Sequence, residues 1–292
     1  MAGGSTASLN LWGILSESKR IIHAHSRHFL ALSVMFLLPL SFSLTVSPSL
    51  LSSNTHILLS LTLTQNNQNP IPFLLLFLLS LLLLSLFAFS SITHSVFHGF
   101  FGRPVKLPSA LLSIAPSFLP LLSASLILYP PLPLLLPFLR LPLPLSLLLL
   151  PCLLYLRLLW TLAPVVAVLE SSWAARPLLR SASLLRGMAP VAASSILFFS
   201  SLYALLLCST SLLATADHHL NRFAFLLRIV LTSALLVLLL LYNAAADTVL
   251  YMYCKAVHGE LAADIADEFA WQYVSLPFDD AKVPHVVSVV TA

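Results

Sequence analysis

Between residues 29 and 250 this chain consists of long apolar runs, each close to the length of a membrane-spanning helix. A helix needs about 20 mostly apolar residues to cross the hydrocarbon core of a bilayer. Because backbone polar groups must bond to one another inside a bilayer, such runs form helices there. Six runs have this character: residues 29–47, 71–92, 109–129, 145–169, 190–214 and 223–249.

These runs divide the chain into three parts: an N-terminal segment at 1–28, a transmembrane domain at 29–250 and a C-terminal tail at 251–292. The predicted fold class is all-α, a polytopic transmembrane helical bundle of about six spans with short cytosolic amphipathic segments. The first apolar run starts only at Phe29, and Glu17 interrupts the acid-poor pattern of a transit peptide. We therefore expect the first span to be uncleaved.

Composition favours a membrane protein over a chain folded in water. Charged residues make up 8% of the sequence, whereas a soluble domain carries about 25%. The net charge of +4 is too small to indicate a nucleic-acid partner, and a basic bias on cytosolic loops explains it. The cysteines Cys152, Cys208 and Cys254 have neither metal-ligand nor redox spacing. The expected partner is thus the lipid bilayer, with no cofactor and no nucleic acid.

Residues 129–146 are apolar but crowded with proline. A proline ring removes a backbone donor and clashes with the preceding helical turn. The lipid core does not tolerate the unpaired backbone groups that result. This segment is therefore predicted to be an interfacial or protein-packed loop rather than a seventh span. The sequence does not decide whether this loop re-enters the membrane or forms part of a neighbouring span.

The distribution of basic residues predicts the orientation of the spans. With the N-terminus in the cytosol, ten basic residues fall on the cytosolic side and three on the opposite side. Cytosolic loops of membrane proteins are enriched in Lys and Arg. Both termini are therefore expected in the cytosol. The membrane itself, endomembrane (ER or Golgi) or plasma membrane, stays open. The ten cytosolic positions are Lys19, Arg20, Arg27, Arg103, Lys106, Arg176, Arg180, Arg186, Lys255 and Lys282.

Both cytosolic segments have a helical pattern. Residues 9–28 place Leu11, Ile14, Leu15, Ser18, Ile21 and Ile22 near one helical face. This predicts either a helix lying in the membrane interface or a plain extension of the first span. The tail places acidic residues opposite Leu261, Ile265 and Phe269, and Pro277 ends any helix there. Beyond it, Leu276, Pro277, Phe278, Asp279 and Asp280 are the candidates for binding a protein partner.

Polar residues inside the apolar runs are candidate functional residues, because charges are costly in hydrocarbon. Arg157 lies near the middle of the fourth predicted span, and Glu170 ends that span. Asn243 and Asp247 lie near the inner end of the sixth. These residues predict either structural pairing, with Glu170 and Asp247 meeting Arg176, Arg180 or Arg186, or a path for a substrate or ion.

Histidines form a second candidate site. His94 and His98 are four residues apart at the inner end of the second span, a spacing that can place two imidazoles on one metal ion. Membrane di-iron oxygenases use several histidine boxes, but the doubled-histidine boxes are absent here. An interfacial polar cap is the favoured interpretation of the pair, and a metal site is the alternative.

Three stretches carry a resemblance to a known family. They are residues 11–22, residues 158–190 and the tail from Tyr251. The second contains W-x-L-A-x-V-V-x-V-L-E followed by R-S-x-x-L-x-x-G, at Trp160, Leu162, Ala163, Val165, Val166, Val168, Leu169, Glu170, Arg180, Ser181, Leu184 and Gly187. Together these stretches resemble an uncharacterised plant family of six-span integral membrane proteins. More distantly, the linker pattern is similar to the membrane domain beside some bacterial glycerophosphodiesterases. The resemblance implies six helices and no established reaction, and the phosphodiesterase activity does not transfer because no catalytic barrel is encoded.

Three functional hypotheses follow. The leading one is a non-enzymatic membrane protein that presents its cytosolic tail to partners in membrane organisation or trafficking, although the tail could instead cap the basic loop at 176–186. The second is a transporter or channel of unknown substrate that uses Arg157, Asn243 and Asp247. The third is a metal-dependent membrane lipid enzyme.

Overall fold

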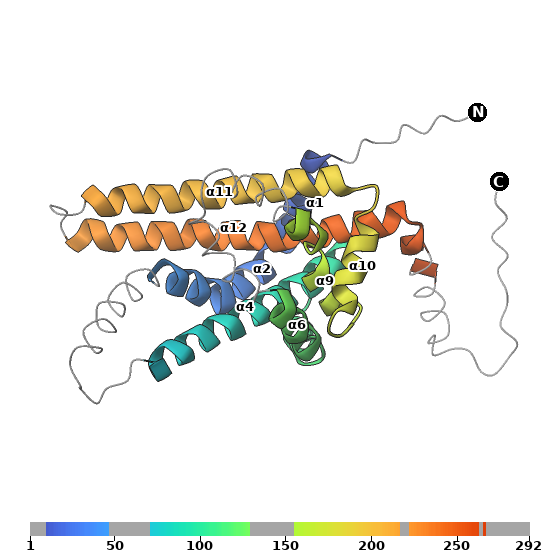
Figure 1. Ribbon diagram of the computed structural model, residues 1–292, viewed down its shortest axis with the longest axis horizontal. Coiled ribbons are helices and arrows are strands. Elements are labelled where there is room, and N and C mark those ends of the chain that lie inside the picture. The colour runs from blue at the N-terminus through green and yellow to red at the C-terminus, as the bar shows by residue number, and fades with distance from the viewer. Residues whose placement is uncertain (1–9, 47–70, 129–154, 217–221, 263–264, 267–292) are drawn as a thin grey trace, which may run out of the picture. The chain divides into compact units, whose positions relative to one another are not determined.

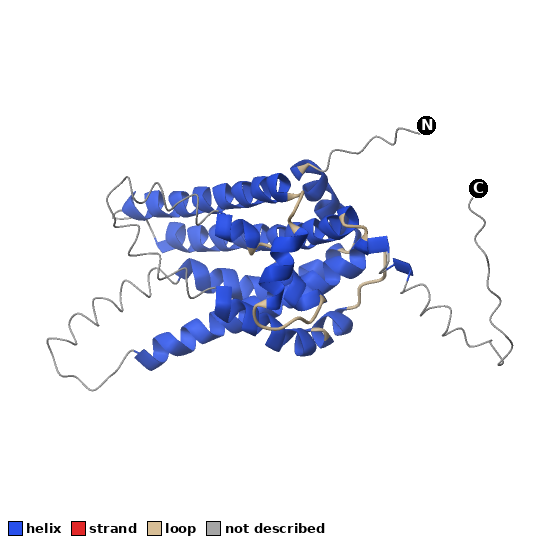
Figure 2. Ribbon diagram, turned by 45° about the vertical axis from the view of Figure 1, so that its right-hand side comes forward, coloured by secondary structure: helices blue, strands red, loops and turns tan. Residues whose placement is uncertain are grey.

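The computed structural model describes residues 10–46, 71–128, 155–216, 222–262 and 265–266. Within these ranges the chain is built of helices joined by short loops, and no strand is present there (Figures 1 and 2). The chain divides into two compact units, Met1–Cys254 and Lys255–Ala292. The first unit contains the apolar helices and the candidate site residues of the membrane domain.

Four helices are long and apolar enough to cross a membrane: Ser26–Val46, Leu75–Phe100, Ala189–Ser209 and Leu226–Val257. The first begins with α2 (Ser26–Leu32), and the other three lie in α4 (Ile71–Phe100), α11 (Ala189–Ala216) and α12 (Arg222–Val257). In both views α11 and α12 run side by side (Figures 1 and 2). The predicted all-α membrane bundle is therefore confirmed as a fold class.

The outer surfaces of these helices are rich in leucine. Large apolar side chains stand exposed on α4, α11 and α12, an arrangement that costs free energy in water and none against lipid tails. Examples are Leu75, Leu76, Leu205, Leu207, Leu226, Leu227, Leu231 and Leu238. These helices thus direct their apolar side chains outward, as membrane-spanning helices do.

The first helices are separated by a break at His25. α1 (Leu11–Ala24) ends there, and α2 (Ser26–Leu32) continues into a π-helical turn, η1 (Ser33–Leu37). The helical face predicted at residues 9–28 is present, with Ile14, Ser18 and Ile21 buried. However, this face packs on α4 and α11, so protein rather than lipid covers it. The segment is also a separate helix rather than a straight extension of the first span.

Gly99 permits the close packing of α1 on α4. A Cβ at this position would lie 2.8 Å from Cγ2 of Ile21, closer than carbon atoms approach in proteins. The absence of a side chain therefore lets the two helices meet near the end of α4. The same contact brings the His25 ring to the α4 surface, 3.7 Å from that Cβ position.

The third and fourth predicted spans are shorter helices in the structure. The run at 109–129 divides into α5 (Leu107–Leu112) and α6 (Ile114–Leu128), with Pro120 inside α6. The described part of 145–169 is an apolar helix over Tyr155–Leu169, interrupted before α9 (Ala163–Leu169). Residues 129–154, including the predicted proline loop, lie outside the described residues. The total of six spans therefore stays a prediction.

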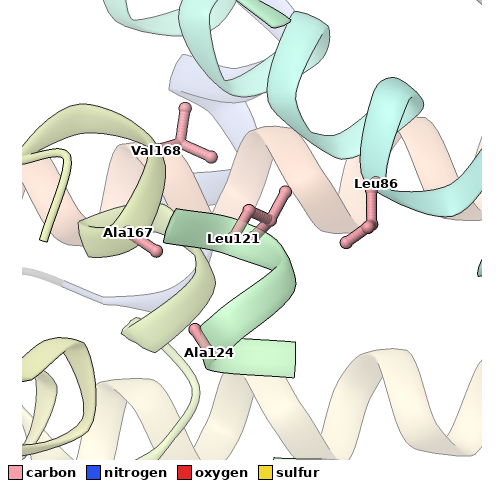
Figure 3. Close-up of a cluster of buried hydrophobic side chains, with 5 residues drawn as sticks. All are labelled: Leu86, Leu121, Ala124, Ala167 and Val168. Atoms are coloured by element: carbon pink, nitrogen blue, oxygen red, sulfur yellow. The ribbon is translucent and has the colours of Figure 1, made fainter. Parts of the chain in front are cut away.

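These shorter helices pack against the apolar part of α4. Leu86 of α4 forms a buried cluster with Leu121 and Ala124 of α6 and with Ala167 and Val168 of α9 (Figure 3). Two of the five members are alanines, which let helix backbones approach closely. α10 (Arg176–Leu184) follows and packs on α9. The cluster places α6 and α9 beside the middle of a long apolar helix.

Candidate functional site

A polar network joins α9, α10 and α12 around Glu170, the residue at which α9 ends. The Tyr251 hydroxyl donates a hydrogen bond to Oε1 of Glu170 over 2.9 Å. Arg180 Nε lies 3.4 Å from the same oxygen. The prediction that Glu170 meets a basic residue of the 176–186 loop is thus confirmed for Arg180. The Arg180 and Glu170 side chains keep 33% and 27% of their surface exposed, so this ion pair is screened and contributes little by itself.

Ser181 supports this network from α10. Its hydroxyl donates to the carbonyl oxygen of Leu159 over 2.7 Å and accepts the Leu162 N–H over 3.2 Å. Both partners flank the interruption of the apolar helix before α9, where backbone groups lose their helical partners. Ser181 is fully buried. The R-S pair of the sequence motif therefore has two structural roles, an ion pair to Glu170 and a bridge across a broken helix.

A second polar group lies within the apolar helices. Asp247 of α12 is only 8% exposed, and the charge of Arg157 acts on its carboxyl group. The Tyr203 hydroxyl of α11 is within electrostatic range of both residues. Asn243, one turn before Asp247, is half-buried. The charge that acts on Asp247 is that of Arg157, which is not among the predicted partners Arg176, Arg180 and Arg186. The predicted pairing of Asp247 with one of those three stays a prediction.

Two residues of the predicted transport path, Arg157 and Asp247, are thus close enough for the charge of one to act on the other. Arg157 is exposed, whereas Asp247 is buried. Tyr203 was missed by sequence reasoning because a tyrosine in an apolar run is common, and no spacing links it to either charge.

The histidine pair lies on the last turns of α4. The Nε2 atoms of His94 and His98 are 3.0 Å apart, and the rings meet edge to face with centroids separated by 4.3 Å. Both rings are partly accessible. His28 of α2 contacts the same helix through Ser95, with 2.9 Å between Nε2 and Oγ. Among the described residues no group of three His, Cys, Asp or Glu side chains could hold a metal ion.

The His28–Ser95 contact does not form a nucleophile and base. The Ser95 hydroxyl donates to the carbonyl oxygen of Ser91 over 2.6 Å, so its proton is directed away from His28. The imidazole N–H consequently donates to the serine, which is the reverse of the arrangement that activates a nucleophile. Ser95 is also fully buried. This contact joins α2 to α4.

A family model described as Domain of unknown function (DUF8558) matches residues 138–282. The match covers slightly less than half of the chain. The matched region contains Arg157, Glu170, Arg180 and Asp247. It begins after His94 and His98, so the histidine pair lies outside it. No curated protein and no solved structure matches the chain.

The tail candidates lie outside the described residues. Leu276, Pro277, Phe278, Asp279 and Asp280 fall in the segment 267–292. The family match includes all five, since it extends to residue 282. The described start of the second unit is helical through Val257, as the end of α12.

Proposed function

We propose that this protein is a non-enzymatic, multi-pass membrane protein that presents its C-terminal tail to protein partners in the cytosol. In this proposal six spans cross an endomembrane or the plasma membrane, both termini are cytosolic, and the chain is a relative of the plant six-span proteins that it resembles. The carrying observation is the bond between Tyr251 and Glu170. It ties the last turn of α12 before Lys255 to α9, so the tail starts from a fixed helix.

The contacts at this end of the first unit support the proposed topology. The Phe100 and Tyr253 rings, near the ends of α4 and α12, lie 6.3 Å apart between centroids. Glu170 lies at the same end through Tyr251. The charge pattern assigns all three segments to the cytosolic side, so the contacts and the charges agree. The packing of α6 beside Leu86 supports a position of the third span at membrane depth.

Proximity labelling in native membranes tests the tail. We expect the full chain to label a set of cytosolic proteins that is lost when the chain stops after Lys255. A matched control removes residues 1–9, which are also proposed to be cytosolic, and should keep the set. A finer variant, Asp279→Asn with Asp280→Asn, removes two charges without shortening the tail and should reduce labelling. A partner set unchanged by the truncation would contradict the proposal, and would leave a tail that docks on its own 176–186 loop.

A second candidate function, a transporter or channel, is favoured by the buried carboxyl group of Asp247, on which the charge of Arg157 acts. Intramembrane charges often mark the path of an ion or polar substrate. If this path is used, Arg157→Leu should fold normally and abolish flux in reconstituted vesicles, and Asp247→Asn should do the same. The matched control is Arg228→Leu, a basic residue near the start of α12. Normal flux in both site variants would remove the pair from any transport mechanism.

A further inference from the structure

The last turns of α4 bring two imidazole nitrogens within hydrogen-bond distance of each other, a separation that also suits two nitrogens on one metal ion. In a zinc or copper complex the metal–nitrogen distance is about 2.0–2.1 Å, so two cis imidazole nitrogens lie about 2.9–3.4 Å apart. The Nε2 atoms of His94 and His98 are separated by 3.0 Å. Both belong to one helix, in which positions i and i+4 lie on the same face. Little rearrangement is therefore needed for both nitrogens to reach one ion.

We propose that His94 and His98 bind one divalent transition-metal ion of the zinc and copper class. Imidazole suits these ions, and affinity rises toward copper along the first-row series. The partly accessible rings leave the remaining coordination positions to water. The proposal concerns binding only, includes no reaction, and is independent of the tail.

The surroundings of the pair indicate how strong the site should be. Within the described residues His94 Nδ1 is buried without a hydrogen-bond partner, so no second group orients this ring. Metal-binding histidines usually donate their other nitrogen to such a group, and its loss costs affinity. Two further histidines lie against α4. His28 of α2 contacts Ser95, and His25, in the break before α2, approaches Gly99. We therefore expect a reversible site that responds to the metal concentration rather than a permanently loaded one.

Equilibrium dialysis of the full-length protein, purified in detergent with a histidine-free tag, tests the site with Zn²⁺ and Cu²⁺. We expect one ion per chain, and an affinity about tenfold weaker or more in His94→Ala and in His98→Ala. The matched control is His23→Ala, which removes an exposed histidine of α1. Equal affinity of the two site variants and the unmodified protein would overturn the proposal.

A second measurement does not depend on the folding of the His94 and His98 variants. The electron paramagnetic resonance spectrum of the unmodified protein with one equivalent of Cu²⁺ should show two coupled nitrogens. The neighbouring histidines His218 and His219 could also supply two nitrogens. A His219→Ala variant removes this alternative and should give the same spectrum as the unmodified protein. A spectrum with a single coupled nitrogen, or the loss of the two-nitrogen signal in His219→Ala, would overturn the assignment to His94 and His98.

Discussion

At the scale of single residues, the most consequential polar group of the described bundle is Ser181. Its hydroxyl bonds to one backbone acceptor and one backbone donor on either side of the break before α9. In a buried position water cannot replace these bonds, so an unpaired group is expensive. By contrast, Ser183 in the same helix donates only to the Arg180 carbonyl oxygen within its own helix.

We predict that Ser181→Ala lowers the free energy of unfolding by about 1–3 kcal/mol, because the Leu162 N–H and the Leu159 carbonyl lose their buried partner. Ser183→Ala is the matched control and should change it by less than about 0.5 kcal/mol. Unfolding in mixed micelles, followed by helicity, measures both values. If the two variants were equally stable, the proposed bridge across the helix break would be wrong.

At the scale of helices, sequence reasoning succeeded where apolar character and helix coincide. The runs at 190–214 and 223–249 predicted most of α11 and α12. The apolar run at 71–92 is shorter than α4, which continues to Phe100 and includes the histidine pair expected at the inner end of this span. The segment Ser91–His98 is polar enough to end an apolar run, but the Ser91 and Ser95 hydroxyls bond to carbonyls of the helix, and Ser95 also contacts His28 of α2. The backbone therefore stays helical beyond the apolar run.

The third and fourth runs show the limit of a count of apolar residues. The run at 109–129 predicts one helix, but the structure divides it at Ser113. At about 1.5 Å per residue, a 15-residue helix such as α6 is about 22 Å long. Pairing of this short helix with α9 and α4 through small residues is a tertiary effect that hydropathy does not contain.

For the candidate site, the sequence identified the charged residues but predicted only some of the pairs that they form. Glu170 with Arg180 was predicted because both flank one short linker. Arg157 and Asp247 were named for one transport path, but no pairing between them was predicted, since 90 positions of chain separate the two and no spacing rule connects such distant helices. Tyr251 was missed for the same reason. Its partner Glu170 lies in another helix, and only packing brings the hydroxyl to the carboxylate.

At the scale of the whole molecule, the account depends on how many times the chain crosses the membrane. Six spans and four spans both leave the two termini on one side, so locating the termini alone does not separate them. The location of the proline-rich segment 129–146 distinguishes six spans from four. This segment lies outside the cytosol only if α6 and the helix ending in α9 belong to crossing segments.

The most direct measurement is therefore the accessibility of a short epitope inserted at residues 129–146, compared with epitopes at the two termini. In cells whose plasma membrane alone is permeabilised, the terminal epitopes should bind antibody. For an endomembrane protein the inserted epitope should bind only after full permeabilisation, and for a plasma-membrane protein it should bind on intact cells. An inserted epitope that shows the same accessibility as the termini would contradict the six-span account and leave four crossings.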